Sequence, residues 1–249
     1  MISQSLMDKL LQLHLPAFRN GLREQISNPQ YAELSFEERL LLLVDLECTR
    51  RLDSRTKRRL KLAGFPMQAA IEDLDFAPDR GLERRLVLEL SQCNWIDKAL
   101  NILISGATGT GKSFLACSLG VSACIMGYSV SYLHTARFLH ALNTARKEDS
   151  YLNLLHSFSK IDVLILDDWM RDPIPLVAAQ DLLEIFDDRF GHSATIIASQ
   201  VPVSDWHVRF PDPTLADAIL DRTIHNAYRL PLLGDSQRKA RGFRSMSNT

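Results

Sequence analysis

Short apolar runs alternate with longer helix-forming segments from residue 101 onward. The apolar runs, which are typical of buried parallel strands, lie at 101–105, 129–133, 161–167, 195–199 and 228–232. Helices are expected between them, at about 112–126, 135–147, 150–158, 176–190 and 214–222. Strand–helix–strand units of this kind join into a parallel sheet through right-handed crossovers. The pattern therefore predicts an α/β domain built on a five-stranded parallel sheet flanked by helices.

The first 65 residues lack strand patterning and predict a small all-helical N-terminal domain. Apolar residues at helical spacing run from Leu6 to Leu22, with a break expected near Pro16. Ser35 followed by Glu37 and Glu38 predicts the start of a long helix that continues to about residue 62. We therefore expect a helical domain over 1–65 and the α/β domain over 66–249.

Two further elements are expected before the first strand of the sheet. The run 71–76 predicts a short edge strand, and the run 82–95 predicts a helix. Trp95, at the end of that helix, is interpreted either as a core residue or as an aromatic that flanks a bound adenine.

The second half of the long N-terminal helix is strongly basic. Its cations are Arg50, Arg51, Arg55, Lys57, Arg58, Arg59 and Lys61, against a single acid, Asp53. Two interpretations remain open for this segment. It is either a solvated helix face or a basic surface for nucleic acid or an acidic partner.

A glycine-rich loop, Gly-Ala-Thr-Gly-Thr-Gly-Lys-Ser, follows the first strand of the predicted sheet. Backbone N–H groups of such a loop point at phosphates, Lys112 reaches the β- and γ-phosphates, and the Ser113 hydroxyl ligates Mg²⁺. The helix that begins at about Lys112 adds its positive N-terminal end. We therefore expect ATP with Mg²⁺ here. The expected ATP-binding residues are Gly106, Ala107, Thr108, Gly109, Thr110, Gly111, Lys112, Ser113 and Phe114.

The strand expected at 161–167 ends in two carboxylates, Asp167 and Asp168. Ligands of open α/β sheets bind at this carboxyl edge, so Asp167 is expected to hold Mg²⁺, mostly through water. Asp168 is expected to orient and deprotonate the attacking water. Gln200 follows the next strand and is expected to lie between the acids and the γ-phosphate, unless that strand simply leaves the core. Guanine is not expected, because the chain has no Asn-Lys-x-Asp run.

Composition excludes several classes of protein. The chain has 249 residues, 46% of them hydrophobic and 24% charged, and a net charge of -1, as in ordinary globular proteins. No apolar run approaches the roughly 20 residues that span a membrane, and residues 1–15 lack a signal-peptide core. The four cysteines show no metal-ligand spacing. We therefore expect a cytoplasmic protein with reduced thiols and no membrane contact.

With these motifs in place, the chain resembles the AAA+ ATPases. Within them it is most similar to the IstB family, the transposition helper ATPases that insertion sequences encode beside their transposase. Helicase loaders of the DnaC type are near relatives. The stretches that carry the resemblance are 101–113, 164–169, 198–206, 216–222 and 233–238. It covers nearly the whole chain and implies an AAA+ P-loop NTPase core behind the helical N-terminal domain.

The resemblance also implies roles for single residues. Gln200 falls at the sensor position, and Arg222 falls at the position of an arginine finger, which acts on the neighbouring subunit's γ-phosphate. The resemblance therefore implies a homo-oligomer with ATP at its subunit interfaces. Arg238 falls at the position of a second arginine sensor, although both arginines are alternatively surface cations. Asp168 replaces the usual catalytic Glu, which implies slow hydrolysis that depends on DNA or a partner, and Met170 stands where relatives commonly carry glycine.

The function implied is that of an ATP-dependent regulator that oligomerises on duplex DNA and activates or recruits a transposase. The N-terminal domain is expected to dock the transposase. Arg137, Arg146 and Lys147, together with Lys160, are the candidate DNA contacts, because relatives present helices of this region to the duplex. Two alternatives remain open: a loader of a replicative helicase, and a nucleotide-switched scaffold without useful turnover.

Overall fold

The computed structural model describes residues 4–237. The chain forms two compact units, Met1–Arg58 and Arg59–Thr249. The first unit is helical and the second contains the whole sheet, so the predicted fold class, an α/β sheet domain preceded by a helical region, is confirmed.

The N-terminal unit is built from helices whose ends follow the sequence signals. Its elements are α1 (Gln4–Gln12), α2 (Pro16–Ser27), the 3-10 helix η1 (Pro29–Glu33) and α3 (Phe36–Ala63), which continues into the second unit. Pro16 is the first residue of α2, where a missing N–H is harmless. Glu38 N donates to Ser35 Oγ (3.3 Å) and Ser35 N donates to Glu38 Oε2 (2.7 Å), so the predicted start of α3 is a reciprocal capping box.

Glu47 joins α2 to α3. Its side chain is 6% exposed, and its Oε2 accepts hydrogen bonds from the backbone N–H groups of Ala17 (2.9 Å) and Phe18 (3.3 Å) in the first turn of α2. Arg50 and Arg51 donate to its Oε1 at 2.8 and 3.1 Å. Burial alone would raise the pKa of Glu47, but these hydrogen bonds outweigh it and lower the pKa to about 2.

We expect Glu47→Gln to destabilise the packing of α2 on α3 by about 1–3 kcal/mol, because an amide has a single acceptor oxygen and cannot accept all of these hydrogen bonds. The folded-state pKa lies below the ordinary value of 4.5, so the stabilisation is complete above that pH and is lost as the pH falls towards 2. Hydrogen–deuterium exchange of α2 in the full chain measures the effect. Asp45→Asn, an exposed site on the same helix, is the matched control. Unchanged protection of α2 in Glu47→Gln would contradict the assignment.

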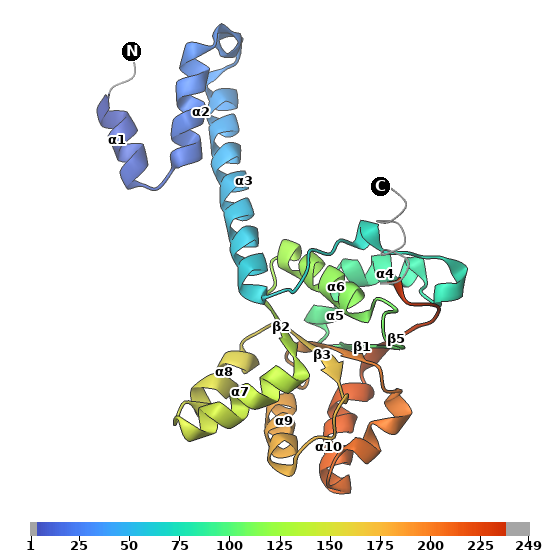
Figure 1. The fold of residues 1–249 in the computed structure, drawn as a ribbon. Coiled ribbons are helices and arrows are strands. Elements are labelled where there is room, and N and C mark those ends of the chain that lie inside the picture. Colours follow the sequence, from blue (N-terminus) through green and yellow to red (C-terminus); the bar gives the residue numbers. More distant parts are fainter. Residues whose placement is uncertain (1–3, 238–249) are drawn as a thin grey trace, which may run out of the picture. The chain divides into compact units, whose positions relative to one another are not determined.

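The sheet of the second unit is parallel throughout and has the strand order β2-β3-β4-β1-β5 (Figure 1). The strands are β1 (Asn101–Gly106), β2 (Val130–His134), β3 (Val163–Trp169), β4 (Ala194–Ser199) and β5 (Ala227–Leu232). All five lie close to their predicted positions. The order places the loops after β1, β3 and β4 next to one another at the carboxyl edge.

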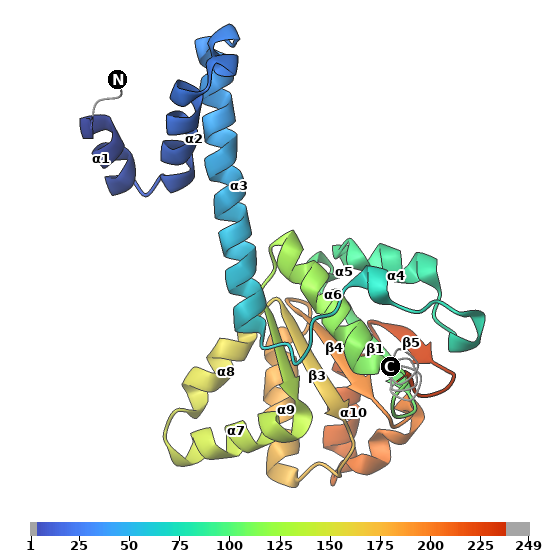
Figure 2. The ribbon, with the colours of Figure 1, turned by 45° about the horizontal axis from the view of Figure 1, so that its top comes forward.

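Helices cover both faces of this sheet, as Figures 1 and 2 show. One face carries α4 (Arg84–Ser91), α5 (Asn94–Asp97) and α6 (Lys112–Met126), and the other carries α7 (Thr135–Lys147), α8 (Tyr151–Ser159), α9 (Leu176–Arg189) and α10 (Pro213–Ile224). The remaining short 3-10 helices are η2 (Ile71–Asp73), η3 (Pro78–Arg80), η4 (Val203–Asp205) and η5 (His207–Arg209). Within β1, Ile102 and Ile104 join the core under α6, whereas Leu103 joins the core on the opposite face. Burial on both faces explains why the strands are almost wholly apolar.

Two expectations for the segment before β1 were wrong. The run 71–76 forms no strand, because its apolar side chains pack into the core around α6 instead of pairing with the sheet. The single helix expected over 82–95 is interrupted at Cys93, whose φ of 63° ends α4 and starts α5. Trp95 is a core residue: it is 2% exposed, and its Nε1–H donates to the Leu90 carbonyl (2.8 Å).

All four cysteines are free thiols. Burial raises the pKa of Cys93 and Cys124 to about 11 and that of Cys117 to about 12, so these thiols stay protonated at neutral pH. Within residues 4–237, none of the helices has the length and apolar character needed to cross a bilayer.

Candidate functional site

The glycine-rich loop lies between β1 and α6 at the carboxyl edge of the sheet. Lys112 is the first residue of α6, and its Nζ donates to the carbonyl oxygens of Gly106 and Ala107, both at 2.8 Å. Gly109 has φ 86°, and a Cβ there would fall 2.2 Å from Ser236 Oγ, so only glycine fits. The loop backbone is therefore fixed at the N-terminus of a long helix, an arrangement suited to binding phosphates.

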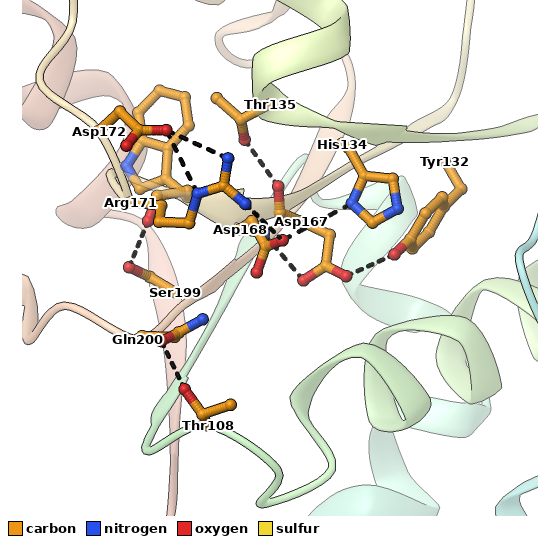
Figure 3. Close-up of polar contacts among 11 residues, drawn as sticks. Thr108, Tyr132, His134, Thr135, Asp167, Asp168, Arg171, Asp172, Ser199 and Gln200 are labelled. Carbon is orange, nitrogen blue, oxygen red and sulfur yellow. Dashed lines mark hydrogen bonds and ion pairs between the residues drawn. The ribbon is translucent and has the colours of Figure 1, made fainter.

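Asp167 and Asp168 end β3 beside this loop and differ in environment (Figure 3). Asp167 is 2% exposed, and its carboxylate accepts hydrogen bonds from the Tyr132 hydroxyl and from the Asp168 backbone N–H (2.9 Å). Burial and the bond to Asp167 raise the pKa of Tyr132, so Tyr132 remains a donor. The Asp168 side chain is one-third exposed and lies 3.8 Å from both His134 Nδ1 and Arg171 Nη1. Hydrogen bonds thus fix the position of the Asp167 carboxylate, whereas the Asp168 carboxylate is accessible to solvent.

The backbone at the end of β3 is strained. Asp168 and Met170 have φ values of 55° and 58°, and the pairing of β3 with β4 shifts register between Leu166 and Trp169. Asp tolerates the left-handed region, whereas for Met it costs roughly 1–2 kcal/mol. Met170 is fully buried beside Trp169 in the core. A glycine would adopt this φ without strain, whereas Met170 accepts the strain and gains core packing.

Gln200 follows β4 and is tied to the phosphate loop. Thr108 Oγ1 donates to Gln200 Oε1 at 2.6 Å, and Figure 3 shows this bond beside the two aspartates. The preceding Ser199 donates from its hydroxyl to the Trp169 carbonyl (2.6 Å), which joins the ends of β4 and β3. The three segments of the predicted site are therefore linked by side-chain hydrogen bonds.

A cavity of about 230 Å³ brings these groups together. It is lined by Thr108, Gly109, Gly111, Lys112, Ser113 and Phe114 of the loop, and by Asp168 and Gln200. The loop also contains Gly106, Ala107 and Thr110, whose hydrogen bonds hold its backbone. Asp167 accepts a hydrogen bond from the backbone N–H of Asp168. The other walls come from Leu115, Leu232 and Gln237 and from a segment that no motif marks, residues 67–82, which we call the strap. Sequence reasoning missed the strap because only its position in space connects it to the loop.

A second cavity, of about 440 Å³, shares Asp168 with the first. Its polar lining includes His134, Arg137, Arg171 and Asp172. Arg137, one of the predicted DNA contacts, is exposed there. Lys147 and Lys160 are also exposed, and their predicted role in DNA binding stays a prediction.

Arg146, another predicted DNA contact, is engaged within the chain. Its Nε donates to the Asp181 carboxylate (3.0 Å), its Nη2 donates to the Tyr151 hydroxyl (2.9 Å), and its guanidinium lies 3.9 Å from the centre of the Tyr151 ring. The hydrogen bond to Asp181 raises the pKa of Arg146. These contacts favour a structural role for Arg146 over a phosphate contact.

Arg222 lies at the opposite edge of the sheet from the loop. It occupies the last turn of α10, and its Nε donates to the Asp187 carboxylate. Its carbonyl accepts a hydrogen bond from the side chain of Asn101, the first residue of β1 (3.1 Å). A strand of this length spans roughly 20 Å, so Arg222 does not reach the loop of its own chain. Arg238 lies outside the described residues.

Comparison with known proteins shows which family the chain belongs to. The family model of the IstB-like ATP binding protein matches residues 8–245. The insertion sequence ATP-binding protein y4pL of Sinorhizobium fredii is 42% identical over 239 residues, which cover 96% of this chain and 98% of that protein.

Solved structures share the fold. AMPPCP-bound DnaA from Aquifex aeolicus matches with a TM-score of 0.59 at 18% identity, over 75% of this chain and 57% of that one. The DnaC helicase loader matches with a TM-score of 0.55 at 16% identity, over 66% of this chain and 96% of that one. The sheet domain thus has the fold of these structures, and the family model and the relative confirm the resemblance to the IstB family drawn from the motifs. The chain belongs to the family of IstB-like ATP binding proteins of insertion sequences.

Proposed function

We propose that this protein is an ATP-dependent regulator of DNA transposition that hydrolyses ATP, oligomerises on duplex DNA, and recruits or activates a transposase. One observation carries the proposal: the phosphate loop, Asp168 and Gln200 line a single cavity in a chain whose relatives are insertion sequence ATP-binding proteins. The cavity supplies the groups for hydrolysis, and the relatives supply the biological setting.

ATP would bind with Mg²⁺ in this cavity. Ser113 and Asp167 offer the oxygen donors that Mg²⁺ prefers. Among residues 4–237 no three His, Cys, Asp or Glu side chains gather into a metal site, so phosphate oxygens and water would complete the coordination. When bound, Mg²⁺ neutralises charge on the β- and γ-phosphates.

Four side chains have separate roles in the hydrolysis of ATP. Lys112 compensates phosphate charge, and Asp168, partly exposed in the cavity, accepts the proton of the attacking water. Gln200, held by Thr108, orients that water or the γ-phosphate. Arg222 stabilises the transition-state charge in a neighbouring subunit, because in its own chain it lies at the far edge of the sheet. ATP hydrolysis therefore depends on oligomerisation.

The helical unit Met1–Arg58 is the proposed docking site for the transposase. Eleven of the twenty-two large hydrophobic side chains that are exposed within residues 4–237 belong to this unit, although it is the smaller of the two. A high share of exposed apolar side chains favours a surface that binds a partner. The basic residues in the second half of α3 retain both interpretations.

Fluorescence anisotropy with a labelled duplex tests DNA binding. We expect ATP to strengthen binding at least tenfold relative to ADP, because ATP joins subunits and aligns their cations. The affinity should fall steeply as salt rises, by about one power of salt for each phosphate neutralised. Lys112→Ala should abolish the ATP effect. A flat salt response, or an ATP effect that survives Lys112→Ala, would refute the proposal.

The identity of the client is tested separately. Capture of the transposase encoded beside the gene by the full chain, but not by a chain lacking residues 1–58, is the expected result. Capture of a hexameric helicase instead would support the helicase-loader alternative. The likeness to the DnaC helicase loader shows the fold alone and does not favour that alternative.

A further inference from the structure

One cation of the nucleotide cavity lies outside the phosphate-loop motif. Arg80, in the strap, lines the cavity together with Gly111 and Lys112, and its side chain is 7% exposed. Its Nη2 donates to the Thr110 carbonyl at 2.5 Å. Its Nε and Nη1 have no hydrogen-bond partner among residues 4–237, and the half-exposed Asp75 carboxylate lies 3.7 Å from Nη1.

A buried guanidinium with unused donors destabilises a fold. Arginine stays charged in any protein environment, and burial removes the water that would hydrate its N–H groups. Such donors are normally paired when buried. Arg80 has unpaired donors in a ligand cavity, and the simplest explanation is that a bound ligand supplies their acceptors.

The strap holds the Arg80 backbone rigidly. Leu233 N, just after β5, donates to the Arg80 carbonyl (2.9 Å), and Arg80 N donates to Ala77 O (3.0 Å). Gly81 has φ 64°, and a Cβ there would fall 3.3 Å from the Pro231 carbonyl, so the strap lies tightly against the end of β5. The guanidinium is therefore positioned before any ligand binds, which reduces the entropic cost of a contact.

The strand order fixes which side of the phosphate loop Arg80 approaches. The loop follows β1, which has β4 and then β3 on one side and β5 on the other (Figure 2). Asp168 and Gln200, at the ends of β3 and β4, mark the side of the γ-phosphate. Arg80 lies beside β5, on the opposite side, and therefore faces the part of the nucleotide that ATP and ADP share.

We propose that Arg80 is a nucleotide-binding residue, whose free Nε–H and Nη1–H donate to phosphate oxygens common to ATP and ADP. The planar fork of the guanidinium suits such oxygens. The inference rests on the proposed function, because it requires ATP to bind in this cavity.

Titration calorimetry of the full chain with MgATP and MgADP tests the proposal. Arg80→Met should weaken both nucleotides by roughly 10- to 100-fold, the range for hydrogen bonds to a charged group. The Tm of the nucleotide-free protein should stay level or rise, because two buried N–H donors that lack acceptors are removed. Arg80→Lys, which keeps the charge but lacks the planar fork of donors, should bind both nucleotides several-fold more weakly than the wild type. Arg84→Met, an exposed arginine outside the cavity that stacks on Phe76, is the matched control and should change affinity less than about twofold.

The outcomes separate the inference from the proposed function. A wild-type chain that binds neither nucleotide refutes the proposed function and with it this inference. Wild-type binding with unchanged affinity in Arg80→Met refutes only the inference. A loss of affinity confined to ATP would show that Arg80 is a γ-phosphate sensor. A lower Tm of the nucleotide-free variant would show that Arg80 stabilises the loop through Thr110. Either result overturns the inference. If Arg80→Met does not fold, Arg80→Lys decides, because undiminished affinity in that variant overturns the proposal.

Discussion

Asp168→Asn is expected to stop ATP hydrolysis while ATP stays bound. An amide does not accept the proton of the attacking water, and loss of a general base lowers turnover by about 10²- to 10⁴-fold. Asn has the same size as Asp and tolerates the left-handed backbone found at position 168, so the end of β3 should keep its shape. We therefore expect a long-lived complex of the oligomer with ATP and DNA. Steady-state phosphate release, together with retention of labelled duplex, measures both effects.

Asp172→Asn is the matched control for that experiment. Asp172 is exposed, pairs with Arg171, and lines the second cavity but not the nucleotide cavity, so its substitution should leave turnover within about twofold. Unchanged turnover in Asp168→Asn would remove Asp168 as the base. Loss of ATP binding in Asp168→Asn would instead mean that the carboxylate maintains the shape of the cavity.

The sheet and the phosphate site were predictable because their signals are local. A strand buried on both faces is almost wholly apolar, and β3 shows this up to the point where Asp167 and Asp168 begin. The strand–loop–helix order around Lys112 fixes the phosphate loop at the carboxyl edge. Parallel strands end at the same edge, so the sequence alone predicts that Gln200 lies near Asp168.

Other features depend on contacts between distant residues and left no signal in the sequence. Arg80 meets Thr110 across 30 positions, and no spacing rule connects the strap with the loop. Likewise, Arg146 was predicted to contact DNA, and only the structure shows that it pairs with Asp181, 35 positions away. The break at Cys93 requires a left-handed residue, and cysteine is a weak indicator of that conformation. Such features follow from packing rather than from local propensity.

Arg222→Ala is expected to lower hydrolysis by about 10³- to 10⁵-fold, the range for an arginine finger, with ATP affinity nearly unchanged. The reason is geometric: Arg222 lies beside Asn101 at the amino edge of the sheet, away from the loop of its own chain, and its proposed target is the γ-phosphate held by the next subunit. Asp187→Asn is the informative control. It removes the ion-pair partner of Arg222 but keeps the arginine, so turnover should be retained if Arg222 acts as a finger.

Mixed oligomers test the action of Arg222 between subunits directly. Neither Lys112→Ala nor Arg222→Ala subunits should hydrolyse ATP alone. In a mixture, an intact loop from an Arg222→Ala subunit meets an intact arginine from a Lys112→Ala subunit, and phosphate release should recover in part. If the mixture stays inactive, or if Asp187→Asn is as inactive as Arg222→Ala, Arg222 holds α10 against α9 and is not a finger. Recovery requires that two chains build one site, which neither variant does alone.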